Sequence, residues 1–191
     1  VGVAASIKHF PGDGVDYRDQ HVTPSVNTMD CDTWDAEFGS VYHKVIDAGA
    51  LTCMVGHITL PSYSMKLNPG LNYGQCLPAS LSKELMTGLL REKLGFNGLI
   101  VTDAAQMAGM SAQLPRYEAV PLSIEAGADM FLFYRDFDED LEYMRRGVAE
   151  GRLSRRRLDE AVTRILAVKA ALGLHRGAQY PEDDDYIYSD Q

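Results

Sequence analysis

The sequence predicts an α/β fold built on a parallel sheet, because short apolar runs alternate with helical patterns along the chain. Four apolar runs, at residues 1–10, 51–58, 98–104 and 130–133, are each followed by a helical stretch. The runs are continuously apolar rather than alternating, which is typical of strands buried on both faces of a sheet. Two architectures fit this pattern, a doubly wound open sheet and part of a (β/α)8 barrel.

Capping residues indicate where the helices begin and end. The stretch 33–48 has Thr33 as its candidate N-cap and Gly49 just past its end. An irregular segment at 59–79 is rich in proline and glycine, and Ser80 after it is the candidate N-cap of the next helix. Further helices are expected at residues 116–126, 137–150 and 154–172.

The composition is that of a globular domain with one core, since 46% of the 191 residues are hydrophobic and 24% are charged. The formal net charge of -9 argues against nucleic acid and anionic lipid as partners, because both repel an acidic surface. No apolar run approaches the ~20 residues of a membrane span. The spacing of the three cysteines, Cys31, Cys53 and Cys76, is not that of a metal site, so we expect them to be reduced thiols. Cys53 lies in an apolar run and is expected in the core.

The first residue is Val1, and the run that begins there already has the character of a buried strand. We therefore expect the chain to be a piece of a longer protein or a processed form of one. The expected organisation is a single unit over residues 1–176 followed by an acidic tail over 177–191. The sequence leaves the compartment unknown and only slightly favours the cytoplasm.

Polar side chains follow the apolar runs where the strands end, and in parallel α/β folds that edge of the sheet carries function. The residues concerned are Lys8, His9, His57, Asp103, Tyr134 and Arg135. Asp103 follows four apolar residues and precedes a loop, so its carboxylate is expected at the mouth of the sheet. A helix cap or a solvated loop residue is an equally good explanation of Asp103 taken alone.

A second candidate segment, KHFPGDGVDYRDQH, follows the first strand. Gly12 and Gly14 allow a tight turn with positive φ. Asp19 and His21 lie two residues apart, a spacing at which the carboxylate can hold the imidazole in one tautomer and raise its basicity. For an isolated D-x-H pair, a surface ion pair is the commoner explanation.

Several blocks of the sequence, in order, resemble glycoside hydrolase family 3, and most closely its β-N-acetylglucosaminidase (β-hexosaminidase) branch. The blocks run from residue 3 to about residue 174: KHFPGDG, DQH, MVGHI, LPASLS through LREKLGFNGLIVTDA, and AGADMFLF. The resemblance implies that the chain is the second half, strands 5–8, of a (β/α)8 TIM-type barrel. It further implies a carbohydrate substrate and the missing N-terminal half of the barrel as partners, with no metal and no organic cofactor.

The resemblance also implies a role for each matching residue. Asp103 corresponds to the nucleophile of a retaining mechanism that passes through a covalent glycosyl-enzyme. His21 corresponds to the acid/base, and Asp19 to the carboxylate that orients it. The implied substrate-binding residues are Lys8, His9, His57 and Met107, of which His57 also reads as a buried core histidine and Met107 as a residue that packs the site.

Alternatives remain for the sugar that is cleaved and for whether the chain is catalytically complete. A β-glucosidase of the same family is one, and a catalytically incomplete sugar-binding or assembly fragment is another. Asp13 stands where the branch often has histidine, a change that bears on sugar preference. A neutral imidazole at His21 also admits an anionic acceptor, so phosphorolysis is a further hypothesis. The chain alone is expected to be weakly active or inactive without the first barrel half.

Overall fold

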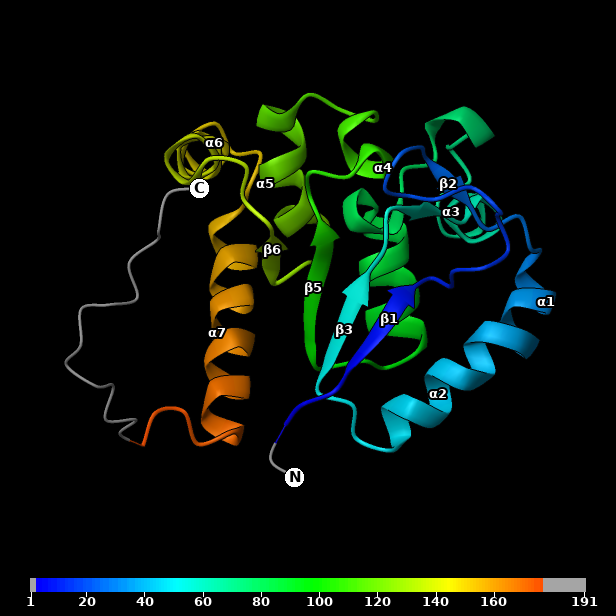
Figure 1. Cartoon of the computed structure of the whole chain (residues 1–191), viewed down its shortest axis with the longest axis horizontal. Helices are drawn as coiled ribbons and strands as arrows, with labels where there is room; N and C mark the ends of the chain where they lie inside the picture. The colour runs from blue at the N-terminus through cyan, green and yellow to red at the C-terminus, as the bar shows by residue number, and fades with distance from the viewer. Residues whose placement is uncertain (1–2, 177–191) are drawn as a thin grey trace.

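The computed structural model describes residues 3–176, which form a parallel sheet flanked by helices (Figure 1). The sheet has the order β1-β3-β5-β6, with strands β1 (Ser6–Phe10), β3 (Thr52–Val55), β5 (Leu99–Ala104) and β6 (Met130–Leu132). All three neighbouring pairs are parallel. The strand order follows the chain without reversal, as in a (β/α)8 barrel, whereas a doubly wound sheet reverses at a switch point.

A second, two-stranded parallel sheet lies at the carboxyl end of the main one (Figure 1). It pairs β2 (Ser25–Val26) with β4 (Ile58–Thr59). This pairing fastens the end of the long loop after β1 to the segment that follows β3. The loop that carries Asp19 and His21 is therefore held at both of its ends.

The helical segments mostly follow the predicted order, and they are α1 (Cys31–Trp34), η1 (Asp35–Gly39), α2 (Ser40–Asp47), α3 (Pro61–Leu67), η2 (Tyr73–Gln75), η3 (Ala79–Leu81), η4 (Glu84–Lys93), α4 (Ala108–Ser111), α5 (Arg116–Ala126), α6 (Phe137–Ala149) and α7 (Arg155–Ala171). Helix α5 spans the predicted residues and ends at Gly127. The predicted acidic tail at 177–191 lies outside the described residues.

Three local predictions were wrong. The N-cap of α1 is Asp30, whose carboxylate accepts from the backbone N–H groups of Asp32 and Thr33, so Thr33 lies inside the helix. Segment 59–79 contains α3, which starts at a proline because a missing N–H costs nothing in the first helical turn. Ser80 lies in η3 and does not cap a helix; its hydroxyl is 2.7 Å from the ring of His57.

An aromatic cluster packs beneath the end of β1. The Phe10 and Trp34 rings meet edge-on with centroids 6.2 Å apart, and Trp34 stacks on Tyr42 at 6.1 Å. The indole N–H of Trp34 donates to the Pro11 carbonyl at 2.7 Å. Because Phe10 and Pro11 immediately precede the PGDG turn, this cluster fixes where the loop after β1 begins.

The amino end of the sheet is held by a buried ion cluster around Asp129, directly before β6. The Asp129 carboxylate, fully buried, lies 2.5 Å from a guanidinium nitrogen of Arg91 and 2.5 Å from one of Arg157. Arg164 is a third neighbour at 3.6 Å, and the backbone N–H of Ile100 donates to the carboxylate at 2.9 Å. The cluster joins η4, α7 and the start of the strands.

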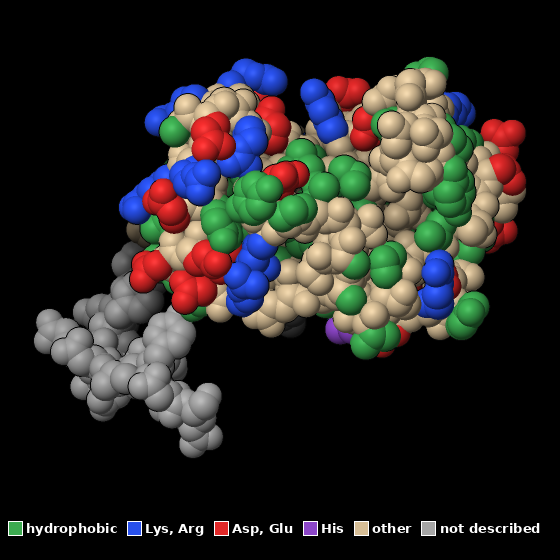
Figure 2. Space-filling model, turned by 90° about the horizontal axis from the view of Figure 1, so that it is seen from above, with side chains coloured by type: hydrophobic (Ala, Val, Ile, Leu, Met, Phe, Trp, Pro, Cys, Tyr) green, Lys and Arg blue, Asp and Glu red, His purple; other side chains and the backbone are tan. Residues whose placement is uncertain are grey.

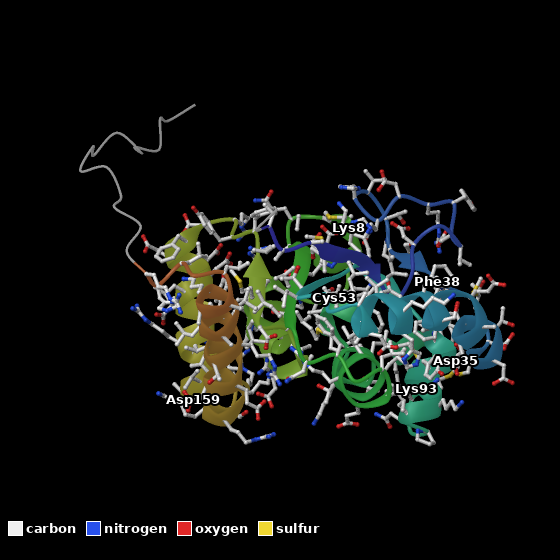
Figure 3. All side chains as sticks on the ribbon, turned by 90° about the horizontal axis from the view of Figure 1, so that it is seen from below. Lys8, Asp35, Phe38, Cys53, Lys93 and Asp159 are labelled. Carbon is white, nitrogen blue, oxygen red and sulfur yellow. The ribbon has the colours of Figure 1, made fainter. Side chains whose placement is uncertain are left out.

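A further tie joins η1 to η4. Asp35 and Lys93 lie side by side (Figure 3), with the ammonium 2.5 Å from the carboxylate, and the hydroxyl of Tyr63 on α3 donates to Asp35 at 2.6 Å.

In residues 3–176 no helix has the length and apolar character needed to cross a membrane. Cys31, Cys53 and Cys76 are free thiols, as predicted, and burial raises the pKa of Cys53 to about 12.

Candidate active site

Asp103 lies near the carboxyl end of β5, where the sequence places it. One carboxylate oxygen accepts from the backbone N–H of Ala104 at 2.8 Å, and the other lies 3.6 Å from Nε2 of His9. The Asp103 side chain is only 14% exposed. Because β3 lies between β1 and β5, the His9 and Asp103 side chains approach each other across the middle strand.

His9 lies between two carboxylates. Its Nδ1 is 3.4 Å from Asp13, on the opposite side of the ring from Asp103. Asp13, the residue that departs from the branch pattern, thus faces the site. The preceding Lys8 is exposed on β1 (Figure 3), and the Lys8–His9 and Phe10–Pro11 peptide bonds are cis.

The PGDG turn requires glycine at Gly12. Its φ is 126°, and a Cβ there would lie 2.3 Å from the ring of Phe38. Gly14 also has a positive φ, of 98°, so the predicted turn is confirmed. The turn directs the chain from the end of β1 toward the Asp19–His21 loop.

Asp19 and His21 form the hydrogen-bonded pair that their spacing indicates. Nδ1 of His21 lies 2.6 Å from a carboxylate oxygen of Asp19, and the same oxygen accepts from the His21 backbone N–H at 2.9 Å. These two contacts, the backbone one first, hold the pKa of Asp19 below its usual value. The imidazole and carboxylate are 69% and 63% exposed, so Nε2 of His21 is open to a ligand.

Gln20, between the two members of this pair, anchors their loop and was missed in the sequence. It is 5% exposed, and its side-chain oxygen accepts from the His57 backbone N–H at 2.8 Å. Its amide group contacts Asp13 at 3.4 Å, and its carbonyl accepts from the backbone of Gly109 at 3.0 Å. The only signal in the sequence is its position between Asp19 and His21.

The same loop is tied to the start of α4, just after β5. The backbone N–H of Ala108 donates to the His21 carbonyl at 3.0 Å. A Cβ on Gly109 would lie 2.7 Å from Cβ of His57 and 3.0 Å from the backbone oxygen of Gln20, so only glycine lets α4 approach both segments this closely. Met107, at the N-cap of α4, is buried, with 5% of its surface exposed.

His57 is fully buried, as in the core-histidine interpretation. Its Nε2 lies 2.9 Å from the Ala104 carbonyl, and its Nδ1 lies 2.7 Å from the Ser80 hydroxyl. A carbonyl only accepts, so Nε2 carries the proton and Nδ1 accepts from Ser80. Burial lowers the His57 pKa, which favours this neutral form, while the Ala104 carbonyl and Asp103 act in the opposite direction.

The structure brings the predicted site residues to one end of the sheet. His9 contacts Asp103 directly, and the Asp19–His21 loop reaches the β5–α4 segment through backbone hydrogen bonds. The residues missed by sequence reasoning are Gln20 and Ser80, which hold His57. Among residues 3–176, no cluster of three or more His, Cys, Asp or Glu side chains is arranged to hold a metal ion.

Comparison with known proteins decides the family. Residues 1–168 match the model of the "Glycosyl hydrolase family 3 N terminal domain". The chain belongs to glycosyl hydrolase family 3. The expected family and the expected barrel-type α/β fold are therefore confirmed.

Individual relatives agree. A "Beta-N-acetylglucosaminidase/beta-glucosidase" of Cellulomonas fimi is 58% identical over 180 residues, which cover 94% of this chain and 32% of the relative. A solved "Beta-glucoside phosphorylase BglX" is 48% identical with a TM-score of 0.91, covering 93% of this chain and 32% of that one. A family 3 β-N-acetylglucosaminidase from Paenibacillus sp. str. FPU-7 is 30% identical with a TM-score of 0.81, covering 98% and 35%. The chain spans about a third of each relative.

Proposed function

We propose that these residues belong to a retaining glycosidase that removes terminal β-linked N-acetylglucosamine, as a β-N-acetylhexosaminidase, through a covalent glycosyl-enzyme on Asp103. The observation that carries the proposal is the 2.6 Å Asp19–His21 pair, on a loop tied by backbone hydrogen bonds to the segment after Asp103. The names of the relatives from Cellulomonas fimi and Paenibacillus support the choice of sugar.

In the first step the Asp103 carboxylate attacks the anomeric carbon and the glycosidic C–O bond breaks. His21 gives the proton on Nε2 to the departing oxygen, while its Nδ1–H remains bonded to Asp19. In the second step water attacks the same carbon, its proton passes to Nε2 of His21, and the bond to Asp103 breaks. The enzyme returns to its starting protonation state, and the sugar keeps its β configuration.

The exposed Asp19–His21 pair suits this role because Nε2 of His21 is open to a substrate oxygen and imidazole is the side chain that most often serves as general acid and base. Asp19, kept ionised by its contacts with His21, orients the ring and stabilises the imidazolium. We assign Lys8 and His9 to the sugar hydroxyls near the bond that is cleaved, and Met107 to packing beneath the site. His57 holds the Ala104 carbonyl, next to Asp103.

A second candidate is cleavage of β-glucosides, by water or by phosphate. It is favoured by the 48% identity to a protein named as a β-glucoside phosphorylase. An acid/base that is a neutral imidazole places no second anion beside an incoming phosphate, whereas a carboxylate would repel it. In that variant a phosphate oxygen attacks the anomeric carbon of the glycosyl-enzyme, the bond to Asp103 breaks, and the product is a sugar 1-phosphate.

The first half of the barrel is the proposed partner. Within the described residues β1 and β6 are open edges of the sheet, and edges of this kind need to be covered. The relatives are about three times as long as this chain, which agrees with a site completed by other residues. We expect the 191-residue chain alone to be weakly active or inactive.

The test uses the full-length protein that carries these residues. Aryl β-N-acetylglucosaminide and aryl β-glucoside substrates compare the sugars, and product analysis with and without phosphate separates hydrolysis from phosphorolysis. A 2-fluoro glycoside slows release of the intermediate, so mass spectrometry of the digest should find the sugar on the peptide that contains Asp103. A labelled peptide elsewhere, or no turnover of either substrate, contradicts the proposal.

A further inference from the structure

A cavity of about 650 Å³ lies toward the amino end of the sheet. Asn97, just before β5, lines it on one side, and a face of α7 that includes Asp159 and Arg164 lines it on the other (Figure 3). Figure 2 shows the opposite, carboxyl end of the molecule, where hydrophobic side chains occupy the centre and charges of both signs lie toward α6. The proposed active site is at that end, and neither Asp103 nor His21 lines the cavity.

Positive charge exceeds negative charge beside this cavity. The buried Asp129 carboxylate is the shared partner of three guanidinium groups, which belong to Arg91, Arg157 and Arg164. Burial lowers the pKa of Arg91 to about 10, and the charges of Arg164 and Arg157 act in the same direction, as expected where cations outnumber anions. Buried charge that lacks a counter-ion destabilises a fold, so a further anion would be favourable here.

The acidic residues of the cavity wall do not supply the missing charge. Asp159 is paired with Arg155 at 2.9 Å, and Glu160 is paired with Arg156 at 2.9 Å. Glu160 also lies 3.5 Å from Arg157. Together with the Asp129 cluster, five guanidinium groups thus share three carboxylates among the described residues.

Arg164 is the least satisfied of these guanidinium groups. Its one ion pair within residues 3–176 is with Asp129, which lies 3.6 Å from Nη1. Its Nε is buried, and no described residue accepts a hydrogen bond from it. The side chain is 25% exposed and lines the cavity, so its guanidinium can be reached from there.

We propose that the cavity is an oxyanion site, in which a carboxylate or phosphate group binds the guanidinium of Arg164 and the side-chain amide of Asn97. A planar guanidinium matches a pair of oxygens, and the amide adds N–H donors without adding charge. The oxyanion has two possible sources, a side chain of the first barrel half or a free anion such as inorganic phosphate. The inference goes beyond the proposed glycosidase function, in which no residue of this cavity takes part.

The test compares variants of the full-length protein. Arg164→Met removes the charge and keeps an apolar stem, whereas Arg164→Lys keeps the charge and loses the planar fork. Arg146→Met is the matched control, because Arg146 makes an exposed i,i+4 ion pair with Glu150 on α6 at 3.4 Å and does not line the cavity.

The first measurement detects a free anion. Thermal unfolding is followed at rising concentrations of inorganic phosphate, with sodium chloride adjusted to keep the ionic strength constant. A free anion at this site should raise Tm of the wild type and of Arg146→Met more than Tm of Arg164→Met, because a ligand of the folded state stabilises it. Phosphate bound elsewhere raises all three alike. Arg164→Lys should need about tenfold more phosphate, the effect of one lost hydrogen bond to a charged group.

The second measurement detects a carboxylate of the first barrel half. A water-soluble carbodiimide condenses an amine with a contacting carboxylate into an amide and takes up the water that is released. In Arg164→Lys it should therefore join position 164 to an Asp or Glu outside residues 1–191, which tandem mass spectrometry of the digest locates. The wild type has no amine at this position and is the control.

Either a phosphate response that depends on Arg164 or an amide to the first barrel half supports the site and identifies its occupant. The inference is overturned if phosphate raises Tm equally in the wild type and Arg164→Met and if position 164 is joined to Asp129 alone or to nothing.

Discussion

The two ends of the sheet treat their ionisable groups in opposite ways. At the carboxyl end, Asp19 and His21 are more than 60% exposed and make few contacts outside their own loop. At the amino end, Asp129 is fully buried and contacts Arg91 and Arg157 at 2.5 Å. The chain therefore places similar pairs, a carboxylate and a nitrogen-bearing partner, in opposite environments at the two ends.

Solvent access explains the division. The proton exchange that we propose for His21 requires a reachable group whose partner leaves one atom free, as Asp19 leaves Nε2 of His21. Asp129 has no free position, and burial lowers the pKa of Arg91 to about 10, which still leaves it charged at neutral pH. In barrels of this type the carboxyl end carries catalysis and the amino end stability.

The largest effect should come from Asp103→Asn at the carboxyl end. The amide cannot form the glycosyl-enzyme, so kcat of the full-length protein should fall by about 10⁴-fold or more. The urea midpoint should not change, because the lost carboxylate has no salt bridge shorter than 3.6 Å. An Asn variant that retains even a tenth of the wild-type rate would remove Asp103 from the mechanism.

His21→Gln should slow poor leaving groups by about 10²–10⁴-fold and good leaving groups, such as nitrophenols, much less. The reason is that only a poor leaving group needs its oxygen protonated. Asp19→Asn should show the same pattern with a smaller loss. Equal losses for good and poor leaving groups would indicate that His21 does not act as the acid.

At the amino end, Asp129→Asn should lower the free energy of unfolding by about 3–5 kcal/mol, because it leaves Arg91 and Arg157 buried without their counter-ion. Urea denaturation provides the measurement. Asp159→Asn is the control, since its pair with Arg155 is exposed and should give no measurable change. Comparable midpoints for the two variants would mean that the two ends do not differ as described.

Gln20→Leu tests the carboxyl end further, because there a buried residue positions the exposed Asp19–His21 pair. Loss of its bonds to His57 and Asp13 should reduce kcat/KM about tenfold by releasing the loop. Gln75→Leu, at an exposed glutamine in η2, is the control and should leave kcat/KM unchanged. A Gln20 variant with wild-type kinetics would show that the loop needs no anchor.

The smallest effect concerns pH. The pKa of His57 is lower in the folded state than the ~6.5 of an unfolded chain, so the unfolded state binds more protons as the pH falls. The contribution of neutral His57 is complete above pH ~6.5 and is lost progressively below it. The wild type should therefore lose more thermal stability than His57→Gln between pH 7.5 and 5.5. Parallel Tm curves for the two proteins would contradict this assignment.

The sequence alone predicted the alternation of strands and helices, the positive-φ turn at Gly12 and Gly14, and the ends of α5. It did so because these features depend on local patterns: apolar runs, glycine, and capping residues. It assigned the wrong role to Ser80, because a serine before a helical pattern is usually an N-cap. Nothing in the local sequence indicates that the Ser80 hydroxyl donates a hydrogen bond to His57, 23 residues earlier.

What the sequence determined by itself was therefore the order of the elements and the identity of the polar groups at the strand ends. Only the tertiary structure decided which of those groups meet. His9 reaches Asp103 across β3, and Gln20 joins the loop of Asp19 and His21 to His57 and Gly109. Such contacts follow from strand order and from close packing at Gly109, and both arise from parts of the chain distant in sequence.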